Sequence, residues 1–78
     1  MTQTKLLLIE WIDAATTTGW FPNADEANPA YVWSVGFLAE ENNKFIKIAQ
    51  SISGGDFGDI TVIPLDSVQK RRVLKAKL

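Results

Sequence analysis

Residues 32–52 read VWSVGFLAEENNKFIKIAQSI, and this stretch decides the fold because it has the pattern of a β-hairpin. Apolar and polar or small residues alternate on both sides of Asn42-Asn43, as they do in strands that bury one face. Two asparagines tolerate positive φ, so they suit the two-residue type I′ turn that commonly joins such strands. This turn predicts three cross-strand pairs: Glu41 with Lys44, Ala39 with Ile46, and Phe37 with Ile48.

The segment before the hairpin also reads as a strand. Residues 5–14, KLLLIEWIDA, are mostly apolar on both alternating faces, which is typical of a barrel strand covered on two sides. Trp11 lies within this run and is expected in the core. Within the hairpin, Gly36 would let its strand bend, as a small barrel requires.

The segments after the hairpin are shorter. Residues 60–63, ITVI, predict a β-branched strand that ends at Pro64, and residues 65–68 suit a single 3₁₀ turn. Residues 69–78 predict a last strand. A helix over residues 66–78 stays open as an alternative, because the spacing of Asp66 and Gln69 would allow a capping box.

Two predicted loops separate these elements. Residues 15–31, ATTTGWFPNADEANPAY, form a loop that is long for so small a chain, with room for one helical turn at residues 24–27. Residues 53–59, SGGDFGD, form a second loop. The absence of a following Lys-Ser/Thr pair argues against a phosphate loop there, so the glycines are interpreted as turn residues.

The order of elements predicts an all-β fold in which five short strands close on themselves, as a single domain over residues 1–78 with at most one short helical turn. This order resembles the small SH3-like and Sm-like barrels. In those families a long first loop precedes a central hairpin, and a 3₁₀ turn joins the last two strands. The RNA-binding loops of the Sm family have no clear counterpart here, so the resemblance implies fold and not RNA binding. The matching segments are residues 15–31, 34–50 and 63–68.

Several short phrases of the sequence carry a second resemblance. They are Trp11-Ile12-Asp13-Ala14, Gly19-Trp20, Ser34-Val35-Gly36-Phe37-Leu38 and Ile63-Pro64. These phrases are similar to small proteins of tailed bacteriophages. This resemblance implies an accessory protein that acts in the cytoplasm of a host cell and binds a host or phage protein.

Composition narrows the functional classes. The 78 residues include no cysteine and no histidine, so the usual zinc ligands and nucleophile–base pairs are missing. We therefore expect no enzymatic activity, no metal site and no cofactor. The longest apolar run, residues 6–9, is far shorter than the roughly 20 residues of a membrane span, so no membrane association is expected.

Two neighbouring acidic residues could act as general acid and base or bind a cation, but their positions in the sequence favour a structural role in turns. Asp13, Asp25, Glu26, Asp56 and Asp59 all lie in or beside predicted loops, where aspartate commonly bonds to nearby backbone amides. We interpret them as turn residues rather than as general acids, general bases or cation ligands.

Charge is distributed unevenly along the chain. Residues 1–66 carry three lysines against nine acids, a net −6, whereas residues 67–78 carry five basic residues and no acid, a net +5. The basic segment could contact a nucleic acid or a nucleotide through Lys70, Arg71 and Arg72, or it could simply cover the acidic body. In a strand, Lys70 and Arg72 would share one face and Arg71 would lie on the other.

Aromatic residues around the long loop are the most informative candidates for binding. Exposed aromatic side chains form stacking platforms for bases and hot spots for proteins, whereas the alternative is that one or two of them plug the end of the barrel. We expect a non-enzymatic module that binds a host or phage protein, or a second copy of itself, through these residues; a nucleic-acid or nucleotide binder is the alternative. The four candidates are Trp20, Phe21, Tyr31 and Trp33.

Overall fold

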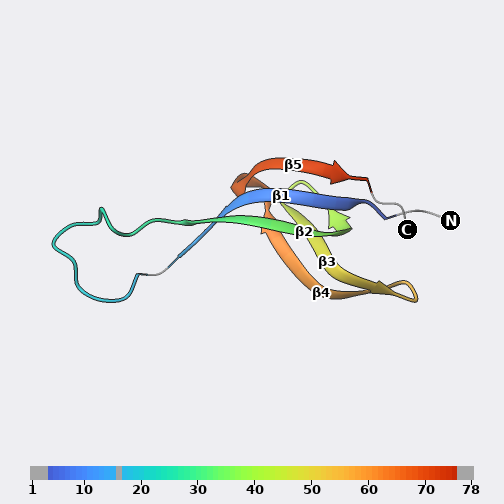
Figure 1. The fold of residues 1–78 in the computed structure, drawn as a ribbon, viewed down its shortest axis with the longest axis horizontal. Helices are drawn as coiled ribbons and strands as arrows, with labels where there is room; N and C mark the ends of the chain where they lie inside the picture. The colour runs from blue at the N-terminus through green and yellow to red at the C-terminus, as the bar shows by residue number, and fades with distance from the viewer. Residues whose placement is uncertain (1–3, 16, 76–78) are drawn as a thin grey trace.

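Five antiparallel strands form one sheet in the computed structural model, which describes residues 4–15 and 17–75. The strands lie in the order β4-β3-β2-β1-β5, and β3 and β4 run obliquely to β1 and β5 (Figure 1). The all-β prediction is confirmed. The closed barrel is not, because β4 and β5 are the two edges of the sheet and its hydrogen-bonded order does not return on itself. The strands are β1 (Leu6–Asp13), β2 (Ala30–Glu41), β3 (Phe45–Ser53), β4 (Asp56–Pro64) and β5 (Val68–Leu74).

The core lies on the inner face of the sheet, between β1 on one side and β3 and β4 on the other. Leu7, Ile9 and Trp11 project inward from β1 at every second position and are buried, as Trp11 was predicted to be. The Trp11 Nε1–H donates a 3.0 Å hydrogen bond to Ser34 Oγ, which satisfies the only polar group of the indole. The other buried side chains of this core are Ile46, Ile48 and Ile63.

Strand β2 bends as it crosses the core, and Gly36 is the reason that it can. A Cβ at this position would lie 2.9 Å from the Ala49 carbonyl oxygen and 3.0 Å from Ile48 Cβ, so only glycine fits so close to β3. The pairing register shifts between Leu38 and Glu40, which leaves a bulge at Ala39. The predicted bend is therefore present.

The predicted register of the central hairpin is wrong. Asn42 and Asn43 do not have positive φ, so the turn is not type I′. Instead, Asn42 Oδ1 accepts hydrogen bonds of 2.8 Å from the amides of Lys44 and Phe45, an Asx arrangement that lengthens the turn. The predicted pairs of Glu41 with Lys44, Ala39 with Ile46 and Phe37 with Ile48 are consequently absent. The observed pairs are Glu41 with Ile46, Glu40 with Lys47, Leu38 with Ile48 and Phe37 with Ala49.

The predicted second loop, residues 53–59, is also wrong in extent. Strand pairing continues to Ser53 and resumes at Asp56, so only Gly54 and Gly55 remain as a two-residue turn. Their φ values are 58° and 89°, the left-handed region that a tight hairpin turn requires. The glycines are thus turn residues, as interpreted, and β4 is longer than residues 60–63.

The C-terminal elements follow one of the two predicted alternatives. A 3₁₀ turn, η1, spans Leu65–Ser67, and β5 follows it as a strand rather than a helix. The Leu65 amide donates a 2.9 Å hydrogen bond to the Lys44 carbonyl, which ties η1 to the β2–β3 turn. The predicted end of this strand, residues 76–78, lies outside the described residues. Among the described residues, no helix is long and apolar enough to cross a membrane.

The long loop projects away from the sheet as an extended arm (Figure 1). We use the name arm for residues 17–29, all of which are exposed. The loop is shorter than predicted, because Ala30 and Tyr31 already belong to β2. The helical turn predicted at residues 24–27 is a single reverse turn, in which the Ala27 amide bonds to the Ala24 carbonyl at 3.1 Å.

Candidate functional site

The outer face of β5, β1 and β2 gathers apolar and basic side chains. The register places Ile12 opposite Tyr31, and Glu10 opposite both Trp33 and Lys70. Because successive residues of a strand alternate between faces, these positions all project to the side of the sheet away from the core. We define the outer face as Leu6, Leu8, Glu10, Ile12, Tyr31, Trp33, Val35, Phe37, Lys70, Arg72 and Leu74.

The aromatic residues of this face are largely in contact with solvent. Tyr31 is 69% exposed and Trp33 is 62% exposed, and Val35 beside them is 52% exposed. The sequence prediction placed Trp33 on the hairpin strand, as observed, but it placed Tyr31 at the end of the loop, whereas the structure places Tyr31 on β2. A run of large apolar side chains that is rimmed by polar residues is typical of an interaction surface.

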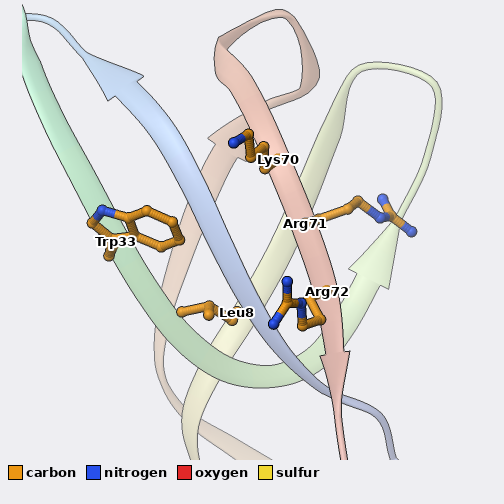
Figure 2. Close-up of a pocket in the computed structure, with 5 residues that line it drawn as sticks. All are labelled: Leu8, Trp33, Lys70, Arg71 and Arg72. Carbon is orange, nitrogen blue, oxygen red and sulfur yellow. The ribbon is translucent and has the colours of Figure 1, made fainter.

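Trp33 and the three predicted basic residues line the same recess, together with Leu8. Its volume is about 480 Å³, it is open to solvent, and it runs from Trp33 on β2 past Leu8 on β1 to Lys70 and Arg72 on β5 (Figure 2). Within residues 4–15 and 17–75, Lys70 and Arg72 form no ion pair, so their charges remain available. The recess therefore offers an aromatic ring and two cations to one ligand.

Arg71 has a different role from its two neighbours. Its guanidinium points away from Leu8 and Trp33 (Figure 2) and donates two hydrogen bonds, 2.6 and 3.0 Å long, to the Glu41 carboxylate at the end of β2. This paired hydrogen bond lowers the pKa of Glu41 below its ordinary value and raises that of Arg71. The alternation predicted for a strand is confirmed, and Arg71 joins the edge strand to the central hairpin rather than adding its charge to the recess.

The arm carries the other two aromatic candidates. The Trp20 side chain is completely exposed, with a relative exposure of 102%, and Phe21 is 41% exposed. The Phe21 ring lies close to Gly19, within 3.6 Å of where a Cβ would stand, which explains its partial shielding. The alternative in which these aromatics plug the end of the barrel is wrong, because the arm extends away from the core (Figure 1).

The candidate site includes residues that sequence reasoning missed. The remaining apolar residues of the outer face were not singled out as binding residues; they are Leu6, Leu8, Ile12, Val35, Phe37 and Leu74. The signal was present, because residues 5–14 are apolar on both faces. These residues were interpreted as a strand that is covered on both faces. In the described part of the chain, only the inner face of β1 is fully buried.

The carboxylates do not gather into clusters of three or more. Across the described part of the chain, no three acidic side chains lie close enough together to hold a metal ion. Asp25 instead belongs to a local turn, where its amide bonds to Asn23 Oδ1 at 3.0 Å. Asp59 adopts a φ of 54°, a conformation that aspartate tolerates better than most residues.

The outer face presents aromatic surface, two cations and the carboxylate of Glu10. The arm adds the aromatic side chains of Trp20 and Phe21 and the carboxylates of Asp25 and Glu26. Comparison with protein-family models, with curated proteins and with solved structures finds no match to this chain.

Proposed function

We propose that this chain is a non-enzymatic interaction module that binds another protein through its exposed aromatic residues. The observation that carries the proposal is the complete exposure of Trp20 on an arm that extends from the sheet. Tryptophan in water has a large apolar surface to bury, and tryptophan and tyrosine are the side chains that most often dominate protein–protein binding energy. Tyr31 and Trp33 add exposed aromatic surface on β2.

The fold proposed for this module is an open form of the SH3-like barrel. Three features support it: the strand order, the 3₁₀ turn between β4 and β5, and the bend of β2 at Gly36. The ion pair between Arg71 and Glu41 joins the edge strand β5 to the end of β2, although these two strands are not hydrogen-bonded neighbours in the sheet. Together with the sequence resemblance to tailed-phage proteins, this fold suggests an accessory protein whose partner is a host or phage protein in the host cytoplasm.

An affinity capture with the full chain as bait tests the proposal. The bait is incubated with an extract of the cells in which the protein is naturally made, and captured proteins are identified by mass spectrometry. The double variant Trp20→Ala/Phe21→Ala should lose the partner, because it removes the apolar surface of the arm. Its stability should change by no more than about 0.5 kcal/mol, since both residues lie outside the core.

A matched control removes exposed apolar surface elsewhere. Ile60 and Val62 on the edge strand β4 are 49% and 48% exposed, so Ile60→Ala/Val62→Ala deletes exposed apolar surface, although less of it, on an element other than the arm. This control should keep the partner. If the arm variant captures the same proteins as the wild type, the aromatic arm is not the binding element and the proposal fails.

A second candidate function is favoured by the recess alone. Trp33 lies beside Lys70 and Arg72 there, and an aromatic platform with adjacent cations is how proteins hold single-stranded nucleic acids or nucleotides. Glu10 lies opposite both Trp33 and Lys70, however, and its negative charge opposes phosphate binding. We therefore rank this function below protein binding.

Salt dependence separates the two candidates. Binding of a fluorescent single-stranded oligonucleotide, of DNA or of RNA, is measured by anisotropy from low to high salt. A nucleic-acid function predicts that affinity falls steeply as salt rises, and that Lys70→Gln/Arg72→Gln reduces both the affinity and that slope. Absence of binding at low salt rules this candidate out.

A further inference from the structure

The outer face and the arm of one chain have complementary features that the single chain does not bring together. The arm carries Asp25 and Glu26 and no basic residue, whereas the recess on the outer face presents Lys70 and Arg72. The arm also presents Trp20 with its whole side chain in solvent, and the recess is an open hollow beside Trp33. In the chain itself the arm extends away from the sheet (Figure 1), so these groups remain unpaired with one another.

We infer that the partner of this surface is a second copy of the chain, with the arm of each copy lying on the outer face of the other. In this dimer Trp20 of one copy occupies the recess lined by Leu8, Trp33, Lys70 and Arg72 of the other, and Asp25 and Glu26 lie near its two cations. The inference rests on the proposed function and names its partner. A reciprocal arrangement has two-fold symmetry, the commonest form of homo-oligomer, and it closes without exposing a further copy of the same surface.

The area available is sufficient for a specific dimer. A fully buried aromatic side chain covers roughly 150–250 Å². Scaled by their exposed fractions, which range from 41% to 102%, the four candidates Trp20, Phe21, Tyr31 and Trp33 offer about 400–700 Å² per copy. Two copies would bury about 800–1,400 Å² through these side chains alone, which reaches the roughly 1,000 Å² expected of a biological interface.

The chemistry of the recess also fits an aromatic occupant. An indole that enters it would stack near the Trp33 ring and lie within reach of the Arg72 guanidinium, and arginine favours the face of a tryptophan ring. Burial against Leu8 would cover the outer side of β1, whose apolar residues the single chain leaves half-buried. This occupant accounts for the apolar character of both faces of β1.

A charge-swap experiment tests the arrangement. Sedimentation velocity on the full chain compares the wild type, an arm variant (Asp25→Lys/Glu26→Lys), a face variant (Lys70→Glu/Arg72→Glu) and an equimolar mixture of the two variants. We expect the wild type to be a dimer and each variant alone to dissociate with a Kd on the order of 100-fold weaker, because like charges then meet across the interface. The mixture should recover the dimer, since both of its arm–face contacts join opposite charges.

The face variant requires a folding control. Lys70 lies opposite Glu10, so Lys70→Glu places two carboxylates across β1 and β5, whereas Arg72 lies opposite Leu8. If circular dichroism shows that the double variant is unfolded, Arg72→Glu alone replaces it and is mixed with Glu26→Lys. The same loss and recovery of the dimer are expected, to a smaller extent.

The outcomes separate this inference from the proposed function. A wild type that stays monomeric at its highest soluble concentration, or a dimer that either charge variant leaves intact, overturns the inference. In both cases the proposed function still stands if Trp20→Ala/Phe21→Ala abolishes capture of a different protein. Loss of the dimer in both variants with recovery in the mixture supports the inference.

Discussion

The two faces of β1 carry similar side chains and have opposite surroundings. Leu7, Ile9 and Trp11 point inward and are buried, whereas Leu8 and Ile12 point outward and lie beside the exposed rings of Tyr31 and Trp33. Hydrophobicity along the strand does not distinguish the two sets. What distinguishes them is whether the bent sheet brings β3 and β4 over that face. The core is thus one side of a strand pair that is apolar on both sides, and we propose that a partner covers the second side.

The largest expected loss of stability, and the sharpest contrast, concerns two adjacent leucines that lie on opposite faces of β1. Leu7→Ala should destabilise the fold by about 2–5 kcal/mol, because it opens a cavity in the core where Leu7 is only 1% exposed. Leu8→Ala removes the same atoms one residue away, from the half-buried outer face, and should cost about 1 kcal/mol or less. Urea unfolding in dilute solution measures both.

This pair of variants can overturn the comparison of the two faces. If Leu8→Ala destabilises the dilute chain as much as Leu7→Ala does, both faces of β1 are equally covered and the outer face is not free to bind. Leu8→Ala should instead weaken binding at the outer face, since Leu8 lines the recess there.

The second largest expected loss of stability concerns the bend of β2 over the core. Gly36→Ala should destabilise by about 1–3 kcal/mol, because the new methyl group meets the Ala49 carbonyl oxygen at 2.9 Å and β2 must move away from β3. Gly58→Ala is the matched control, since its Cβ would lie 3.5 Å from Ser51 Cβ in ordinary contact. Thermal unfolding should show little change in this control, and equal losses in the two variants would show that close approach at Gly36 is not what bends the sheet.

The sequence predicted the strands and their order, because alternation and turn residues are local signals. It did not predict the hairpin register, because Asn42 closes the turn with its side-chain oxygen instead of with a positive φ, and a bulge at Ala39 compensates. The predicted and the observed register are both compatible with the same alternation of apolar and polar residues. The observed register places Leu38, instead of Phe37, opposite Ile48, and Leu38 packs against the core.

The sequence predicted several residues of the candidate site but not their arrangement. Trp20 and Phe21 lie in the long loop and Trp33 lies on a strand, as expected, but Tyr31 belongs to the sheet because Ile12 pairs with it from a strand distant in sequence. The sequence did predict that Arg71 lies on the opposite face of the strand from Lys70 and Arg72, because side chains alternate along a strand. It did not predict that Arg71 pairs with Glu41, because Glu41 reaches β5 only after β2 bends.

The smallest expected effect concerns the link that joins the edge strand to the bent end of β2. Both partners of the Arg71–Glu41 pair are partly exposed, so its contribution is limited to about 0.2–1 kcal/mol despite two short hydrogen bonds. The pKa of Glu41 is lowered in the folded state, so the contribution is complete above the ordinary glutamate pKa and disappears as pH falls through the lowered value. The raised pKa of Arg71 keeps that side chain charged throughout this acidic range.

Glu41→Gln therefore should be less stable than the wild type at neutral pH, and the two should converge at low pH, where the wild-type carboxylate is also neutral. Urea unfolding of both proteins from neutral pH down to about pH 2 measures the difference. Glu40→Gln is the control, because Glu40 contacts Lys47 at 3.3 Å and is more exposed, so its loss should be smaller at every pH. A difference for Glu41→Gln that persists unchanged at low pH would mean that shape, and not charge, holds β5 to the end of β2. The position of β5 in the outer face would then depend on packing at the inner face of the sheet.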